Sequence, residues 1–246
     1  MKNIRLFADT ASMTDIKEMV ANDLVEGYTT NPTLMRRAGI KDYKGFVTEV
    51  LDYLAEHHPD GCISFEVFSS DEMEMVYEAR ELKKLNYHNY NMYVKVPYLN
   101  IDGRPNEQVI RNLLKEDISV NVTAVFNQIQ AIHSIQMLAD DNNDHIISIF
   151  AGRINDTGYP AEKIVAYIIA IPTQNVEILW ASPRQVFDYV LADSVGCHII
   201  TMTPDLIRKI PGIGTPLKLA ALNTSRQFYD DAKACGYKLW ENEDGV

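Results

Sequence analysis

Cysteine is scarce in this sequence. The 246 residues include three cysteines, Cys62, Cys197 and Cys235. No two of them are spaced as CxxC, and no cysteine–histidine cluster has the spacing of a zinc site, so a disulfide scaffold and a structural zinc site are both disfavoured. We therefore expect reduced thiols that pack as small, buried hydrophobic residues.

Long apolar runs are missing as well. No stretch approaches the roughly 20 apolar residues that a membrane-spanning helix needs. The first ten residues, MKNIRLFADT, have neither the apolar core nor the small-residue cleavage site of a signal peptide. These absences predict a cytoplasmic protein that does not bind a membrane.

Positive charge is in the minority. The 23 Lys and Arg residues face 34 Asp and Glu residues, which gives a net charge of −11. An acidic surface repels a phosphate backbone, so nucleic-acid binding is disfavoured, although a single pocket can still be positive enough for a small anion. The hydrophobic share of 46% is ordinary for a folded domain.

Short strand-like runs alternate with longer helical patterns along the whole chain. The predicted strands are Ile4–Asp9, Val25–Thr29, Cys62–Val67, Asn91–Pro97, Ile118–Thr123, Ile146–Phe150, Val176–Trp180 and Cys197–Thr201. The predicted helices are Thr14–Asn22, Asp42–His57, Asp71–Asn86, Asn106–Lys115, Phe126–Ala139, Ala161–Ile171, Pro183–Ala192, Pro204–Ile210 and Leu219–Cys235.

Eight strand–helix units on a chain of this length favour an α/β fold of the (β/α)8 TIM barrel type with an extra C-terminal helix. We expect one barrel domain over residues 1–240 and an acidic tail at residues 241–246. The alternative is a doubly wound open sheet. Its usual glycine-rich turn is missing, because the first strand is followed by Asp9-Thr10-Ala11-Ser12, and a dinucleotide site is therefore disfavoured.

Polar side chains interrupt the ends of strands that should be apolar in a parallel barrel. Any one of them has an ordinary explanation, such as a helix cap, a structural ion pair, a snorkelling lysine or a surface charge. Taken together, they all fall at the C-terminal strand ends, which meet at one mouth of a barrel, and they predict an active site there. The residues are Asp9, Glu66, Lys95, Asn121, Thr123 and Ser148, with Arg153, Ser182 and Arg184 in the segments that follow strands.

Lys95 lies between two valines, Val94 and Val96, and this setting suggests the chemistry of the site. Burial disfavours the charged ammonium, and a neutral amine can form a Schiff base with a carbonyl substrate. Asp9 could take the proton of a substrate hydroxyl, Glu66 with Thr123 could hold a relay water, and arginines suit a phosphate group. This combination indicates class I aldol chemistry on a sugar phosphate.

At this point the motifs are specific enough to show a resemblance. The chain resembles the transaldolase family, including its smaller members and the fructose-6-phosphate aldolases. The similar segments run in order over most of the chain and are FADTAS at Phe7–Ser12, GYTTNPTL at Gly27–Leu34, SFEV at Ser64–Val67, YVKVP at Tyr93–Pro97, NVTAVF at Asn121–Phe126, SIFAGRIND at Ser148–Asp156, WASPRQ at Trp180–Gln185 and HIITMTPDL at His198–Leu206.

The resemblance implies a role for each position. Lys95 matches the Schiff-base lysine, and Asp9 matches the acid that handles the C4 hydroxyl proton. Glu66 and Thr123 match the pair that holds the catalytic water. Dihydroxyacetone-binding positions are matched by Asn31, Asn121 and Ser148, and the phosphate cradle by Arg153, Ser182 and Arg184. No cofactor and no metal are implied.

Two positions discriminate within the family. Fructose-6-phosphate aldolases resemble this chain but carry Gln where it has Glu66 and Tyr where it has Phe150, whereas the transferases carry Glu and Phe. The resemblance therefore implies a transaldolase of the pentose phosphate pathway, which transfers a dihydroxyacetone unit between sugar phosphates such as fructose 6-phosphate and erythrose 4-phosphate. An aldolase that releases free dihydroxyacetone is the alternative.

Two further interpretations of the function stay open. A non-catalytic sugar-phosphate-binding barrel is disfavoured by the complete set of Lys95, Asp9 and Glu66. A metal-dependent barrel is disfavoured because, of six histidines, only His198 lies in a predicted strand. The resemblance also implies a homo-oligomer that uses the C-terminal helix. The loop Tyr98–Pro105 and the stretch after Leu219 are not similar to the family pattern.

Overall fold

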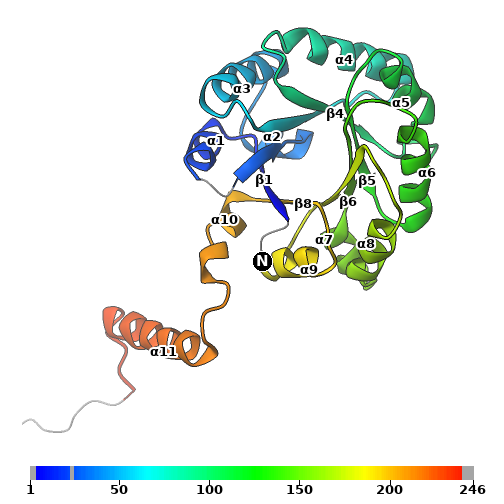
Figure 1. The fold of residues 1–246 in the computed structure, drawn as a ribbon. Coiled ribbons are helices and arrows are strands. Elements are labelled where there is room, and N and C mark those ends of the chain that lie inside the picture. The colour runs from blue at the N-terminus through cyan, green and yellow to red at the C-terminus, as the bar shows by residue number, and fades with distance from the viewer. Residues whose placement is uncertain (1–3, 23–24, 240–246) are drawn as a thin grey trace, which may run out of the picture. The chain divides into compact units, whose positions relative to one another are not determined.

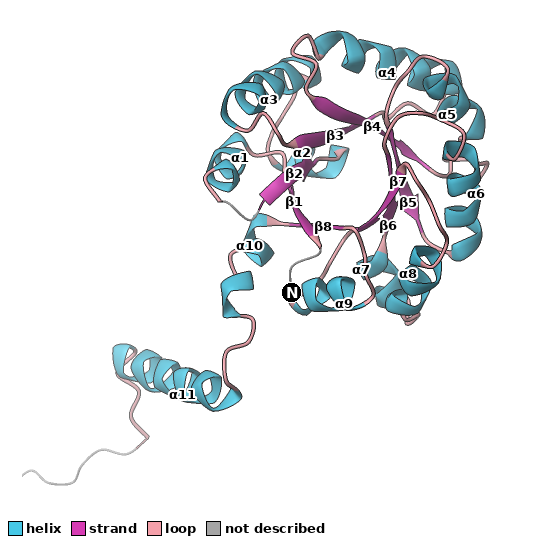
Figure 2. Ribbon diagram, in the orientation of Figure 1, coloured by secondary structure: helices cyan, strands magenta, loops and turns pink. Residues whose placement is uncertain are grey.

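Eight parallel strands form a closed barrel in which each strand pairs with the next one along the chain (Figures 1 and 2). The structure is a computed structural model that describes residues 4–22 and 25–239. The barrel confirms the predicted (β/α)8 fold. The strands are β1 (Arg5–Asp9), β2 (Val25–Thr29), β3 (Cys62–Glu66), β4 (Asn91–Pro97), β5 (Val120–Val125), β6 (His145–Ile149), β7 (Val176–Trp180) and β8 (Ile199–Met202).

Helices follow the strands and ring the barrel (Figure 1). They are α1 (Met13–Val20), α2 (Pro32–Arg37), α3 (Tyr43–His57), α4 (Glu72–Leu85), α5 (Glu107–Leu114), α6 (Gln128–Leu138), α7 (Ala151–Asp156), α8 (Ala161–Ile169), α9 (Phe187–Ser194) and α10 (Pro204–Ile207), followed by the 3₁₀ turn η1 (Ile210–Gly212) and by α11 (Leu217–Ala234). The sequence pattern does not predict α2 or α7, because each has six residues and is too short to show an apolar repeat.

Polar caps fix where several of the helices begin. The side chains of Ser12, Asn31, Asp42, Asp71 and Asn127 each accept a hydrogen bond from the backbone N–H three residues later. Such a bond satisfies one of the unpaired donors in a first helical turn. Four of these caps end a loop that leaves the C-terminal end of a strand, and Asp42 ends the segment between α2 and α3, so these loops have defined paths around the barrel mouth.

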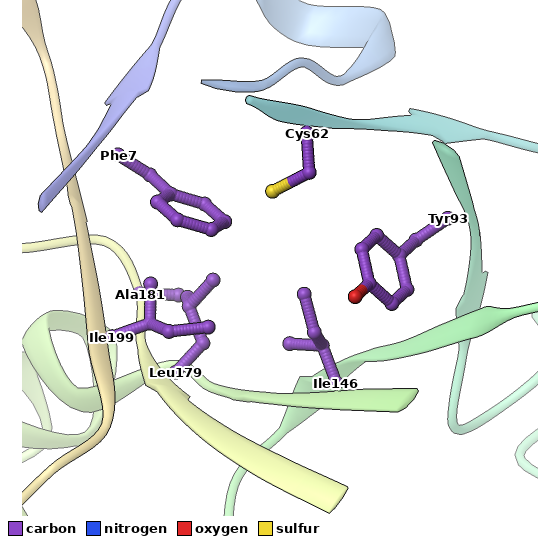
Figure 3. Packing of buried hydrophobic residues seen from close by; sticks show 7 residues of the cluster. All are labelled: Phe7, Cys62, Tyr93, Ile146, Leu179, Ala181 and Ile199. Carbon is purple, nitrogen blue, oxygen red and sulfur yellow. The ribbon is translucent and has the colours of Figure 1, made fainter. Parts of the chain in front are cut away.

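An apolar layer fills the barrel interior (Figure 3). Side chains from six of the strands point toward one another there, and the cluster consists of Phe7, Cys62, Tyr93, Ile146, Leu179, Ala181 and Ile199. Gly27 on β2 belongs to the same level, because a Cβ at this position would lie 2.8 Å from Cys62 Sγ and from the Phe7 ring. The bulk of its neighbours therefore requires glycine here.

Two residues further along the strands, the interior becomes polar. Successive side chains of a strand alternate between its two faces, so residues two apart share a face. Asp9 follows Phe7 by two residues, and Lys95 follows Tyr93 by two residues. On four further strands the corresponding positions are also polar, and they are Thr29, Ser64, Ser148 and Thr201. The polar layer therefore lies on the apolar layer, toward the C-terminal strand ends.

The chain divides into two compact units, Met1–Arg208 and Lys209–Val246. The first contains the barrel and its helices. In the second, α11 (Leu217–Ala234) buries none of its residues. Cys235 follows this helix and is exposed, which corrects the expectation of three buried thiols, while Cys62 and Cys197 are buried. The predicted domain over residues 1–240 stays a prediction, and the predicted acidic tail lies outside the described residues.

Among the helices of the described part of the chain, none combines the length and the hydropathy that are needed to cross a membrane.

Candidate active site

A cavity of about 70 Å³ opens in the polar layer at the C-terminal ends of the strands. Most of the predicted site residues line it, namely Asp9, Asn31, Lys95, Thr123, Ser148, Phe150, Arg153 and Ser182. Thr29, Ala181 and Thr201 also line it, although the sequence pattern does not assign them to the site. Glu66, Asn121 and Arg184 do not line it, although Glu66 contacts Lys95 and Asn121 contacts Ser148.

Lys95 stands in the middle of β4, where its side chain enters the barrel. The residue is 5% exposed, and its strand pairs with Glu66 on one side and with Asn121 on the other. The Nζ atom donates a hydrogen bond to the backbone oxygen of Thr30 at 3.0 Å and lies 3.4 Å from Glu66 Oε2. The amine is therefore held in one place by two oxygen atoms at the floor of the cavity.

Two carboxyl groups, those of Asp9 and Glu66, interact with the charge of Lys95. Burial raises the pKa of Asp9, while the charge of Lys95 and a hydrogen bond from Thr29 act against this rise. Burial also raises the pKa of Glu66, against the effect of Lys95, and the nearby Asp9 adds to the rise. Both acids therefore hold a proton more readily than an exposed carboxyl group, which suits them to proton transfer near neutral pH.

A row of hydroxyl groups supports Asp9. Thr29 Oγ1 donates to Asp9 Oδ1 at 2.7 Å, and Thr201 Oγ1 lies 2.6 Å from Thr29 Oγ1. The two threonines come from β2 and β8, the neighbours of β1 in the barrel. A threonine in a strand is ordinary, so only the register of these strands reveals the contact.

A second network fixes Asn121. Ser148 Oγ donates to Asn121 Oδ1 at 2.7 Å, and Asn121 Nδ2 donates to Ser64 Oγ at 3.1 Å. Asn121 is fully buried behind Ser148, which lines the cavity. Ser64 belongs to this network but is not predicted as a site residue, although it stands in the SFEV segment. These bonds fix both ends of the Asn121 amide.

The predicted partnership of Glu66 and Thr123 is not a direct contact. Thr123 Oγ1 is buried and has no hydrogen-bond partner, and Glu66 contacts Lys95 instead. A buried hydroxyl without a partner is costly unless water or a ligand completes it, so this position suits a relay water. Thr123 precedes a bulge of β5, in which Ala124 adopts a φ of 55°.

Asn31 has two functions in one side chain. Its Oδ1 accepts a hydrogen bond from Leu34 N at 3.0 Å as the cap of α2, and the residue also lines the cavity. The cap occupies the amide oxygen, so the amide N–H groups are what Asn31 can offer a substrate hydroxyl. The short helix α2 therefore fixes the orientation of a side chain that lines the cavity.

The predicted phosphate cradle lies where α7 meets the loop after β7. Ser182 has a φ of 60°, and a Cβ on Gly152 would lie 1.7 Å from the Ser182 backbone oxygen. Glycine is therefore required for α7 and this loop to approach so closely. The guanidinium of Arg153 lies 5.2 Å from the centre of the Phe150 ring.

Arg184 has a different environment from Arg153. Its Nε and Nη2 atoms both donate to Asp156 Oδ2, at 2.9 and 2.6 Å, and it does not line the cavity. Arg153 does line the cavity. The two predicted phosphate ligands thus differ, because Arg153 lines the cavity and Arg184 is paired with Asp156.

Two histidines, His145 and His198, lie at the N-terminal ends of their strands, away from the cavity. His145 begins β6 and His198 precedes β8, which corrects the expectation that His198 alone stands in a strand. Their Nδ1 atoms accept backbone N–H groups of Val120 and Ile178, at 3.1 and 2.9 Å. Within residues 4–22 and 25–239, no group of three or more His, Cys, Asp and Glu side chains is arranged to hold a metal ion.

The loop Tyr98–Pro105 is ordered by its own contacts. Leu99 pairs with Pro105 across it, and Asp102 accepts hydrogen bonds from the side chain and backbone of Arg104. Asn100 Nδ2 donates a hydrogen bond of 2.9 Å to the backbone oxygen of Ser70, which lies in the loop after β3. The loop is therefore tied to the segment that follows β3.

Comparison with known proteins identifies the family of this chain. A model of the family described as transaldolase/fructose-6-phosphate aldolase matches residues 6–241. A probable transaldolase of Rhodospirillum centenum is 32% identical over 242 residues, which cover 97% of this chain and 95% of the relative. A probable transaldolase of Clostridium kluyveri is 34% identical, over 81% of this chain and 86% of the relative.

Solved structures with little sequence similarity share the fold. The 4-hydroxy-tetrahydrodipicolinate synthase of Methylacidiphilum fumariolicum matches with a TM-score of 0.56 at 12% identity, over 82% of this chain and 68% of that chain. The thiamine phosphate pyrophosphorylase of Pyrococcus furiosus matches with a TM-score of 0.55 at 10% identity, over 82% of this chain and 86% of that chain. These structural matches show the barrel fold alone. The family model and the curated relatives also show the family, and the chain belongs to the transaldolase/fructose-6-phosphate aldolase family.

Proposed function

We propose that this protein is a Schiff-base-forming transaldolase that transfers a dihydroxyacetone unit between ketose and aldose phosphates. One observation carries the proposal furthest. A buried lysine amine, Lys95, lies on the floor of a small polar cavity, with the carboxyl groups of Asp9 and Glu66 around it. Membership of the family supports the same reaction class.

The first half of the reaction uses Lys95 and Asp9. The neutral amine attacks the C2 carbonyl of the ketose phosphate, and the carbonyl oxygen leaves as water, so that an iminium forms. Asp9 then takes the proton of the C4 hydroxyl while the bond between C3 and C4 breaks. The electron pair of that bond moves into the iminium, which becomes an enamine, and the shortened aldose phosphate leaves.

The second half reverses these steps on another aldehyde. The enamine carbon attacks the carbonyl carbon of the acceptor, and the protonated Asp9 returns its proton to the new alkoxide. Water then hydrolyses the iminium and frees Lys95. Glu66 and the unpartnered hydroxyl of Thr123 are placed to hold that water.

The other predicted site residues bind the substrate. Asn31, Asn121 and Ser148 offer amide and hydroxyl groups to the dihydroxyacetone unit. Arg153, Ser182 and Arg184 surround the position for the phosphate, for which the planar fork of arginine is well suited. Sugar phosphates are accordingly the proposed substrates, and the reaction needs no cofactor.

Release of free dihydroxyacetone is the second candidate function, because it uses the same enamine. Protonation of the enamine needs an acid that faces it. Phe150 lines the cavity and has no hydroxyl to donate a proton, and Glu66, 3.4 Å from Lys95 Nζ, accepts protons when it is ionised. These two residues favour transfer over release.

Borohydride trapping tests the covalent step. Incubation with fructose 6-phosphate and borohydride should reduce the iminium to a secondary amine, and mass mapping should find the adduct on Lys95. Lys95→Arg keeps a positive charge but has no nucleophilic nitrogen at neutral pH, so it should not be trapped. An adduct on another residue, or trapping that persists in Lys95→Arg, would refute the proposed mechanism.

A further inference from the structure

Two buried hydroxyl groups connect three adjacent strands next to the catalytic carboxylate. β1 lies between β8 and β2 in the barrel, and its Asp9 pairs in register with Thr29. Thr29 is 1% exposed and Thr201 is 4% exposed, so little water competes for their hydroxyl groups. Both residues line the cavity together with Asp9.

The direction of the hydrogen bonds follows from a count of hydrogen atoms. A threonine hydroxyl has one hydrogen to donate and two lone pairs to accept with. Thr29 uses its hydrogen on Asp9 Oδ1, at 2.7 Å. In the contact of 2.6 Å with Thr201, Thr29 must therefore be the acceptor and Thr201 the donor, as long as Asp9 is ionised.

We propose that Thr201 is a positioning residue of this enzyme, whose hydroxyl group donates to Thr29 and thereby holds the Thr29 hydroxyl as a donor to the Asp9 carboxylate. The inference rests on the proposed function for the role of Asp9 in proton transfer. Thr201 acts through Thr29 and does not need to touch the reacting atoms.

The donor chain adds to the charges around Asp9. Burial raises the pKa of Asp9, and Lys95 of β4 acts against this rise. Glu66 of β3 has its own pKa raised in part by Asp9, and Arg153 of α7 lines the same cavity. On α1, Asp15 is paired with Arg208, which follows α10. Hydrogen bonds in a chain polarise one another, so donation by Thr201 strengthens the bond from Thr29 to Asp9. Loss of the Thr201 hydroxyl should therefore raise the pKa of Asp9 further.

The direct test is a carbon-13 NMR titration of the carboxyl groups in the full-length protein. Asp9→Asn identifies the Asp9 signal by its absence. We expect Thr201→Val to raise the Asp9 midpoint by about 0.3 pH units, and Thr29→Val, which removes the direct bond, to raise it by roughly one pH unit or more. Thr201→Ser keeps the hydroxyl and should restore the wild-type midpoint.

Ser134→Ala is the matched control for loss of a buried hydroxyl. Ser134 is fully buried on α6 and donates to the backbone oxygen of Gln130 at 2.8 Å, away from the cavity. The Ser134→Ala variant should leave the Asp9 midpoint unchanged. The proposal is refuted if Thr201→Val leaves that midpoint where it is in the wild type, or if Thr201→Ser moves it as much as Thr201→Val does.

Kinetics separate this inference from the proposed function. In Thr201→Val, the acidic limb of kcat/KM should move to higher pH with Asp9. Borohydride trapping with dihydroxyacetone should be unchanged, because that substrate has no C4 hydroxyl group for Asp9 to deprotonate. A wild-type protein that is not trapped at all would refute the proposed function, whereas the NMR midpoints would still decide the role of Thr201.

Discussion

The carboxyl groups beside Lys95 set the pH range of the chemistry at the scale of single residues. Burial raises the pKa of both Asp9 and Glu66. A base works only when it is ionised, and a group with a raised pKa becomes protonated at a higher pH as the solution is acidified. We therefore predict that kcat/KM for transfer falls on the acidic side at a pH above the ordinary carboxyl range of about 4.

A pH profile of kcat/KM with a stability control checks this prediction. Circular dichroism at each pH shows whether the fold is intact, so that unfolding is not mistaken for protonation. Full activity down to about pH 4 in a folded protein would contradict the raised pKa of Asp9 and Glu66.

Glu66 and Phe150 decide the fate of the enamine in our proposal. Glu66→Gln removes a base, and Phe150→Tyr adds a phenol that can donate a proton. We predict that the double variant transfers less dihydroxyacetone from fructose 6-phosphate to erythrose 4-phosphate and releases more of it. A change of about 1.4 kcal/mol between the two barriers would move the product ratio about tenfold.

The measurement is the ratio of transferred to released dihydroxyacetone, for wild type and double variant in the same buffer. The two single variants show which residue contributes more. A wild type that already releases most of its dihydroxyacetone, or an unchanged ratio in the double variant, would contradict the assignment by these two residues.

At the scale of elements, α7 and the loop after β7 supply one arginine each to the phosphate position. Arg153 lines the cavity, whereas Arg184 is held by Asp156. We predict that Arg153→Ala or Arg184→Ala raises the KM of phosphorylated substrates about tenfold, which is the lower end for a charged hydrogen bond because solvent screens both exposed side chains. The KM of dihydroxyacetone should change little, and equal losses for both substrates would assign the arginines another role.

The close approach of these two elements gives a second prediction. A Cβ at position 152 would collide with the Ser182 backbone oxygen, which is not a flexible group. Gly152→Ala should therefore push α7 away from the loop and weaken binding of phosphorylated substrates, while borohydride trapping with dihydroxyacetone persists. Gly158→Ala is the control, because a Cβ there meets nothing within 4 Å, although its φ of +85° strains any other residue. Unchanged phosphate-dependent binding in Gly152→Ala would show that the contact does not matter.

The elements also show what a sequence can reveal and what it cannot. The eight strands are predictable because most are short apolar runs that alternate with helical patterns, and Lys95, Asp9 and Ser148 stand out because they break such runs. The six-residue helices α2 and α7 have no periodic pattern to reveal them. Thr29 and Thr201 stay hidden because threonine is a common strand residue, and only the pairing of β8, β1 and β2 brings their hydroxyl groups together.

At the scale of the whole molecule, the C-terminal helix α11 stands out for its large apolar side chains. Large apolar side chains of α11 are exposed, among them Leu219, Leu222, Phe228 and Tyr229, at 46%, 45%, 67% and 66%. Exposed apolar side chains at this density favour burial against another surface. We predict a homo-oligomer that buries this helix, and a shift to monomers on deletion of residues 217–246. Light scattering checks both states, and an intact chain that is monomeric would contradict the prediction.

The apolar layer beneath the site has a consequence for proton traffic. Its residues are at most 5% exposed, and apart from the Cys62 thiol and the Tyr93 phenol they carry no group that exchanges protons. The layer therefore favours proton exchange between the two acids, Asp9 and Glu66, and solvent through the mouth at the C-terminal strand ends. Access of solvent protons to the site and access of the sugar would then depend on the same opening.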